Sequence, residues 1–190
     1  MLAFLDRQHT GKPNKWNDTG CVNLPHLEVS LTSLYIHFAE VRLRELGIDV
    51  CVLSDGSYKD RHERVNKYAS TDPNCCYISC HINAGGGNYA TCFYDHRSTK
   101  GPVLARYIND RLDNRVPILQ GNTVAVDCNP EDWSKNAFYT ISGVSPVAIC
   151  FEPFFIDFPD HYHLCEMDEL KNIGTCLADG IATFLRMERS

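Results

Sequence analysis

The pattern of apolar and polar positions along the chain switches between short continuous apolar runs and apolar residues spaced three or four positions apart. Short apolar runs, often β-branched, predict buried strands at residues 2–5, 48–53, 76–81, 89–94, 124–126 and 147–152. Apolar residues at three- and four-residue steps predict helices at residues 27–46 and 165–187. A charged helix is predicted at residues 60–69, and a further helix at residues 102–112. Strands separated by helices predict an α/β fold, here a three-layer α/β/α single domain over residues 1–190, with a mixed, mainly parallel sheet.

Two of these helices have a predicted buried face. In the helix at residues 27–46 that face comprises Leu27, Leu31, Leu34, Phe38 and Val41. In the C-terminal helix it comprises Leu170, Ile173, Leu177, Ile181 and Phe184. A polar loop containing Gly and Pro, residues 9–25, separates the first strand from the first helix.

Composition and charge narrow the choice of partners. The chain has 190 residues, of which 44% are hydrophobic, and a net charge of -6. Such a chain is long enough for one domain with a sizeable core, and its acidity argues against nucleic acid as a partner. No apolar run is long enough for membrane insertion, and no protein partner is evident. Residues 1–9 lack the features of a signal peptide, so we expect synthesis in the cytoplasm.

Ten cysteines are many for a protein made without export. Cys51, Cys80 and Cys150 lie within apolar strand-like runs, where a thiol acts as a small hydrophobic group. No C-x-x-C pair and no zinc-ribbon spacing is present. We therefore expect mostly free thiols, with a disulfide scaffold as the alternative.

Chemically capable side chains follow three strands and open one helix. In α/β folds ligands gather at the carboxyl ends of strands. His9 comes after the first strand, His81 and Glu152 end later strands, and Glu28 lies in the first turn of the long helix. Two imidazoles and a carboxylate form a known catalytic zinc set that leaves one position for water, and a second carboxylate can act as general base.

Each of these residues also has an ordinary structural interpretation. A single His near a strand end is usually a hydrogen-bonded surface or core residue. Glu28 fits the positive end of a helix dipole, and Glu152 fits an ion pair with an Arg. Spacing alone does not separate these interpretations, and only the four positions taken together favour a site.

The four positions lie in ordered blocks that resemble the zinc-dependent N-acetylmuramoyl-L-alanine amidases of the type 3 class. The most specific block is Ser79-Cys80-His81-Ile82-Asn83-Ala84, which is similar to the family pattern Ser-x-His-x-Asn-Ala. The other blocks are 5–11 with 18–20, 27–28 with 46–50, 64–69, and 145–155. The resemblance covers nearly the whole chain and implies His9, Glu28 and His81 as zinc ligands and Glu152 as the catalytic carboxylate.

The chain departs from the family pattern at several positions. Gln8 and Thr10 replace the glycines that flank the first ligand in the family. Leu53-Ser54 stands where the family has Thr-Arg, Pro153-Phe154 replaces a Gly after the catalytic Glu, and Asp157 replaces an Asn. These differences concern substrate details more than the metal set.

Other chemical signals are weaker. His161, His163 and Cys165 are ligand types in a polar loop, but ordinary packing is the favoured interpretation. Cys80 and His81 cannot form a nucleophile–base pair, because adjacent strand residues point to opposite faces. Gly85 to Gly87 lack the Lys-Ser/Thr of a phosphate-binding loop. Several aromatic residues are candidates for holding sugar or peptide, although packing is the safer interpretation of each, namely Trp133, Tyr139, Phe154, Phe155 and Tyr162.

The resemblance implies an enzyme that cuts the amide bond between N-acetylmuramic acid and L-alanine in peptidoglycan with the help of Zn²⁺. The expected absence of a signal favours a phage-type lysin, made in the host cytoplasm and acting on the cell wall after release. Two alternatives remain at this point. One is a zinc carboxypeptidase or small-molecule amidohydrolase on a related scaffold, and the other is a non-catalytic wall-binding protein.

Overall fold

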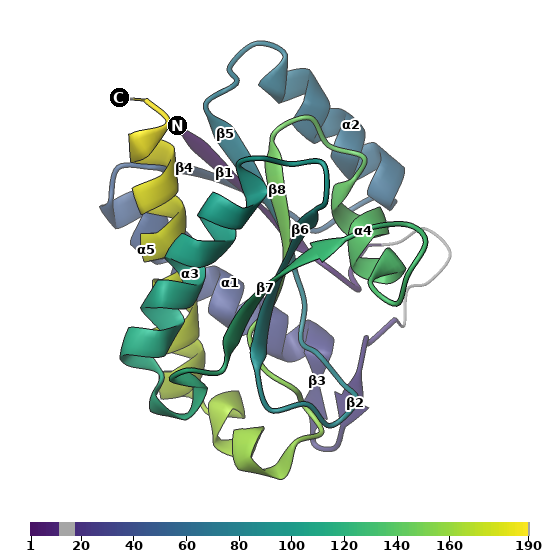
Figure 1. The fold of residues 1–190 in the computed structure, drawn as a ribbon, viewed down its shortest axis with the longest axis vertical. Coiled ribbons are helices and arrows are strands. Elements are labelled where there is room, and N and C mark those ends of the chain that lie inside the picture. The colour runs from purple at the N-terminus through teal and green to yellow at the C-terminus, as the bar shows by residue number, and fades with distance from the viewer. Residues whose placement is uncertain (12–17, 190) are drawn as a thin grey trace.

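A computed structural model describes residues 1–11 and 18–189 of the chain (Figure 1). Six strands form its central sheet, namely β1 (Leu2–Arg7), β4 (Asp49–Leu53), β5 (Cys75–Cys80), β6 (Ala90–Asp95), β7 (Thr123–Cys128) and β8 (Val147–Glu152). Their order is β4-β1-β5-β8-β6-β7, and every neighbouring pair is parallel except β6 and β8. The predicted mixed, mainly parallel sheet is confirmed.

Helices cover both faces of this sheet. On one face lie α1 (Glu28–Glu45), α3 (Gly101–Arg115) and α5 (Met167–Met187), whose apolar residues share a core cluster with the sheet. On the other face lie α2 (Tyr58–Ala69) and the short α4 (Lys135–Ile141), which form a second, smaller cluster with it. The arrangement is the predicted three-layer α/β/α fold. All six residues of β5 are buried because the strand is covered on both faces.

The buried face of α1 differs from the predicted one. Val41 is 44% exposed, and Leu34 and Phe38 are only partly buried. Leu31 is buried as predicted, and the other apolar residues that α1 buries are Tyr35, Ile36, Ala39 and Leu43. Apolar residues occur on more than one side of this helix, so the sequence period did not decide which side faces the core. Packing against the sheet and α5 decides which side of α1 is buried. The predicted face of α5 is confirmed, with all five residues buried.

Polar residues set one helix boundary that hydrophobic periodicity misses. The helix α2 begins before the predicted residue 60, because Ser57 caps it. The Ser57 hydroxyl accepts a hydrogen bond from the N–H of Asp60, and the Asp60 carboxylate accepts one from the N–H of Ser57. The predicted loop at residues 9–25 lies partly outside the described residues. Its described part contains β2 (Val22–Asn23), which pairs with β3 (His26–Leu27).

Two further features bear on the expectations from sequence. All ten cysteines are free thiols, and eight of them are buried. No helix in the described ranges combines the length and the apolar character needed to cross a bilayer.

Candidate metal centre and active site

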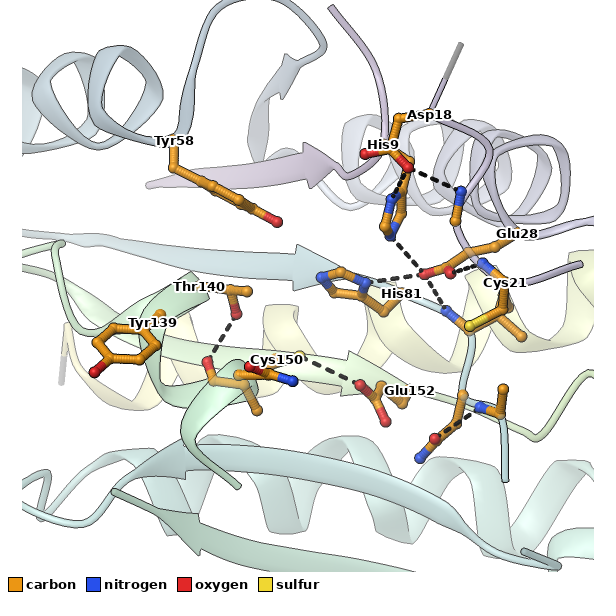
Figure 2. Close-up of a pocket in the computed structure, with 16 residues that line it drawn as sticks. His9, Asp18, Cys21, Glu28, Tyr58, His81, Tyr139, Thr140, Cys150 and Glu152 are labelled. Carbon is orange, nitrogen blue, oxygen red and sulfur yellow. Dashed lines mark hydrogen bonds and ion pairs between the residues drawn. The ribbon is translucent and has the colours of Figure 1, made fainter. Parts of the chain in front are cut away.

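The three predicted metal ligands meet at one edge of the sheet. The strands β1 and β5 are parallel neighbours, with Arg7 opposite Cys80, so their carboxyl ends lie together. His9 follows β1, and His81 follows β5 directly. Glu28 is the first residue of α1, and its side chain turns toward both imidazoles (Figure 2). Residues that are far apart in the sequence are therefore brought to one point.

The distances within this cluster suit a zinc ion. Oε1 of Glu28 lies 3.3 Å from Nε2 of His9 and 2.9 Å from Nδ1 of His81. The three residues each offer a ligand atom, and these atoms all lie within 4.8 Å of one another. Ligands at about 2.1 Å from a tetrahedral zinc ion lie about 3.4 Å apart, so the cluster needs only small shifts to hold one. Two imidazoles and one carboxylate also leave a fourth position for water.

The Glu28 carboxylate is buried and held by the backbone on both oxygens. Its Oε2 accepts a hydrogen bond from the N–H of Cys21 at 2.7 Å, and its Oε1 accepts one from the N–H of Ile82 at 3.1 Å. Gly20 allows this close approach, because a Cβ there would lie 2.4 Å from Oε2. Burial alone would raise the pKa of Glu28, but hydrogen bonds with His81 and His9 outweigh it and lower the pKa well below its usual range. The carboxylate is therefore ready to bind a cation.

A second carboxylate orients His9. Nδ1 of His9 lies 2.9 Å from Oδ1 of Asp18, which leaves Nε2 directed toward Glu28. Burial alone would lower the pKa of His9, but Glu28 and Asp18 outweigh it and raise the pKa. A carboxylate on the outer nitrogen is the usual support of a metal-binding His. The sequence placed Asp18 in a motif but gave it no role, since only the fold shows which His it contacts.

Glu152 lies beside the ligands on the neighbouring strand. The strands β5 and β8 are parallel, and the N–H of His81 donates to the carbonyl of Phe151 at 2.9 Å. The Glu152 side chain is partly buried and lines the same cavity as His9 and His81. Burial raises its pKa, and the charge of Glu28 adds to that effect while His81 opposes it. A carboxylate with a raised pKa in a cleft has the properties of a proton acceptor and donor.

A cavity of about 740 Å³ opens over these four residues. Glu28, the two imidazoles and Asp18 form one wall, and Glu152 lies below them in the view, on the neighbouring strand β8 (Figure 2). The opposite wall comes from α4 and from the start of α2, and the residues it contributes are Tyr58, Asn136, Ala137, Tyr139 and Thr140. The sequence did not predict α4. Of the five aromatic candidates from the sequence, all in the described part of the chain, Tyr139 lines this cavity, with 61% of its surface exposed.

The weaker candidate sites do not assemble. His161 is buried and accepts a hydrogen bond from the N–H of Phe155, whereas His163 is exposed. His161, His163 and Cys165 do not form a metal-ligand cluster. Cys80 is buried in the core cluster that includes α1, away from the cavity that His81 lines.

The glycine-rich loop has an internal anion. The Asp157 carboxylate accepts hydrogen bonds from the N–H groups of Gly85 and Gly86, at 2.8 and 3.1 Å. These two N–H groups are therefore already bound to a carboxylate of the chain, in keeping with the expectation that this is not a phosphate-binding loop.

Comparisons with known proteins agree with this geometry at the level of the fold. No protein-family model and no curated protein matches the sequence. The chain is similar in structure to the N-acetylmuramoyl-L-alanine amidase AmiC2 of Nostoc punctiforme, at 18% identity and a TM-score of 0.76, covering 98% of this chain and 97% of that one. The CwlD amidase from Clostridioides difficile, solved in complex with the GerS lipoprotein, matches at 18% identity and a TM-score of 0.73, with 98% of each chain covered.

A third solved structure is the catalytic domain of the CD27L endolysin, which targets Clostridia difficile. It matches at 19% identity and a TM-score of 0.72, covering 96% of this chain and 97% of that domain. These likenesses extend over almost the whole length of each chain. The protein therefore has the fold of the N-acetylmuramoyl-L-alanine amidases, and the His9, Glu28 and His81 cluster lies at the edge of its sheet.

Proposed function

We propose that the chain is a zinc-dependent hydrolase that cuts the amide bond between N-acetylmuramic acid and L-alanine in bacterial peptidoglycan. Residues 1–190 are one catalytic domain in this proposal. The observation that carries it is the meeting of His9, Glu28 and His81 beside Glu152, in one cavity. The shared fold with amidases from several bacteria supports the choice of substrate.

The chemistry assigns a role to each side of the cavity. Zinc held by His9, Glu28 and His81 would polarise the scissile carbonyl and lower the pKa of a bound water toward about 7. Glu152 accepts the proton of the attacking water and then passes it to the nitrogen of the departing amine. Its raised pKa suits both steps, because the group must hold the proton between them. The products are a free lactyl carboxylate on the muramic acid and a peptide with a new L-alanine amino terminus.

Digestion of purified peptidoglycan tests the proposal. New L-alanine amino termini are identified by mass spectrometry, with the zinc-loaded protein and with the protein treated with a chelator. We expect these termini with zinc, their loss with the chelator, and their return when zinc is added back. Zinc binding without new termini from several wall types would favour a zinc carboxypeptidase or a small-molecule amidohydrolase. The absence of both zinc binding and cleavage would favour a non-catalytic wall-binding protein.

The proposed biological role is that of a phage-type lysin, which is made in a host cytoplasm and reaches the wall on release. The likeness to the CD27L endolysin catalytic domain supports it. Purified protein added from outside should lower the turbidity of a suspension of susceptible cells. A protein that cleaves isolated peptidoglycan but lyses none of a panel of intact cells would speak against a lysin while leaving the amidase activity in place.

A further inference from the structure

A buried arginine beside the turn that carries His9 is not accounted for by the proposed chemistry. Arg61 lies in the first turns of α2 and is 1% exposed. Arginine is rarely buried to this degree, and burial of its charge is tolerated only when the guanidinium is fully paired. Its side chain does not line the metal cavity, so it does not contact a substrate there. What it contacts is the chain on either side of His9.

The guanidinium holds the turn that carries the first ligand. Its Nη1 donates to the carbonyl of Arg7 at 3.0 Å, and its Nη2 donates to the carbonyl of Thr10. The Thr10 hydroxyl closes the same turn by donating to the Arg7 carbonyl at 2.6 Å. His9 itself has a φ of 60°, a left-handed conformation that a residue with a side chain rarely adopts unless its surroundings impose it.

The guanidinium is itself fixed in place from two further sides. Its Nη1 lies 2.5 Å from Oδ1 of Asp6, and the other oxygen of Asp6 accepts a hydrogen bond from the Tyr77 hydroxyl. Its Nε donates to the carbonyl of Asp55 at 3.3 Å, which ties in the loop after β4. That loop is also bound to the His9 turn directly, because the N–H of Gly56 donates to the carbonyl of Gly11 at 3.1 Å.

We propose that Arg61, held by Asp6 and Tyr77, is a positioning residue that fixes the left-handed turn at His9 and so presents Nε2 of His9 to the metal. The inference rests on the metal site of the proposed function. It adds a residue outside the ligand set whose planar guanidinium spans three carbonyls and a carboxylate at once. Lysine has the same charge but a single ammonium group, so it cannot span these acceptors in the same way.

The test compares zinc affinity in Arg61→Lys and in Asp179→Asn. Asp179, on α5, is a largely buried carboxylate that forms ion pairs with Arg42 at 2.9 Å and Arg115 at 2.7 Å. It is a matched control because its substitution also disturbs a partly buried arginine–carboxylate contact. The zinc dissociation constant is measured by competition with a chromophoric chelator, well below the unfolding temperature of each zinc-free protein. The visible spectrum of the cobalt-substituted protein reports the ligand geometry.

We expect Arg61→Lys to weaken zinc binding by about 10- to 100-fold, the range found when groups supporting a ligand are lost. It should also change the cobalt spectrum. Asp179→Asn should lower the unfolding temperature and leave both readouts unchanged. Tyr77→Phe removes the hydroxyl that binds Asp6 and keeps the Arg61 guanidinium. It should weaken zinc binding several-fold, and it provides the test if Arg61→Lys does not fold. Unchanged zinc affinity in the folded Arg61 or Tyr77 variants would overturn the inference, as would an equal loss in Asp179→Asn. A parent protein that binds no zinc would instead refute the metal site itself.

Discussion

Oδ1 of Asp18 lies 2.9 Å from Nδ1 of His9, on the side of the ring that faces away from Glu28. This contact fixes which nitrogen His9 presents to a metal, and the negative charge strengthens the imidazole as a ligand. Asp18→Asn keeps the shape and removes the charge. We expect zinc affinity to fall by about 10- to 100-fold, measured by chelator competition. Asp110 is an exposed carboxylate on α3, and Asp110→Asn should leave the zinc affinity unchanged. An equal loss of affinity in Asp110→Asn would show that the effect of Asp18→Asn does not come from its contact with His9.

Glu152 should be needed for turnover and not for zinc binding. Glu152→Gln keeps the size of the side chain and cannot accept a proton from water. We expect the release of L-alanine termini from peptidoglycan to fall by at least about 100-fold, since general base catalysis contributes about 10²- to 10⁴-fold. Zinc content, measured by atomic absorption, should stay at the level of the parent protein. A variant that loses zinc together with activity would indicate that Glu152 is a ligand.

The same substitution should stabilise the zinc-free protein near neutral pH. Burial raises the pKa of Glu152, so the folded state favours the protonated carboxyl. A carboxyl with a raised folded pKa contributes its stability below its unfolded pKa and loses that contribution as the pH rises through the folded pKa. At pH 7, which is above the ordinary carboxyl range, the raised pKa of Glu152 therefore lowers the stability of the fold, and Glu152→Gln removes that penalty.

Thermal unfolding of the zinc-free proteins checks this expectation. For a domain of this size, Tm should rise by about 2–4 °C for each kcal/mol of penalty removed. The difference between the variant and the parent should shrink as the pH is lowered past the ordinary carboxyl range. A variant that is less stable than the parent at pH 7 would show that the charged form is the favoured one.

The cysteines should react slowly in the native protein. Cys21 lies at the metal cavity, and burial, followed by the charge of Glu28, raises the pKa of its thiol to about 12. Burial raises the pKa of Cys165 to about 11. Only the thiolate is nucleophilic, so both should react with iodoacetamide at pH 8 far more slowly than glutathione does. Mass spectrometry of alkylated peptides measures the rates, and all ten thiols should react after denaturation. A rapid reaction at Cys21 would show that its thiolate is stabilised.

The sequence predicted that the residues of the site come together because its signals are local. His9, His81 and Glu152 each follow an apolar run that is unambiguous as a buried strand, and parallel strands bring such ends together. The strand at residues 147–152 is observed at those bounds. The roles of these residues, however, came from the resemblance of their motifs and not from their spacing.

The wall opposite the metal could not be predicted. The helix α4 has seven residues, too few for a repeating apolar face, and no hydrogen bond from a side chain caps its start. Its place is set by tertiary contacts, since Phe138 and Ile141 pack into the smaller core cluster and Asn66 of α2 binds the carbonyl of Gly143 just beyond it. Arg61 was likewise only one charged residue of a polar helix. Its burial depends on acceptors in β1 and in the loops after β1 and β4, which the helix pattern does not contain.

The chain order of the site has a consequence for synthesis. Glu28, His9 and His81 all come from the segment that ends at His81, directly after β5, whereas Glu152 and the wall formed by α4 come from segments translated later. As the polypeptide leaves the ribosome, the three proposed zinc donors emerge before the proposed proton acceptor does. The proposed capture of metal and the proposed hydrolysis would thus be separated in time by the translation of β6, α3, β7 and α4. In the proposed function, a nascent chain that ends before β8 would carry all three donors and still lack Glu152.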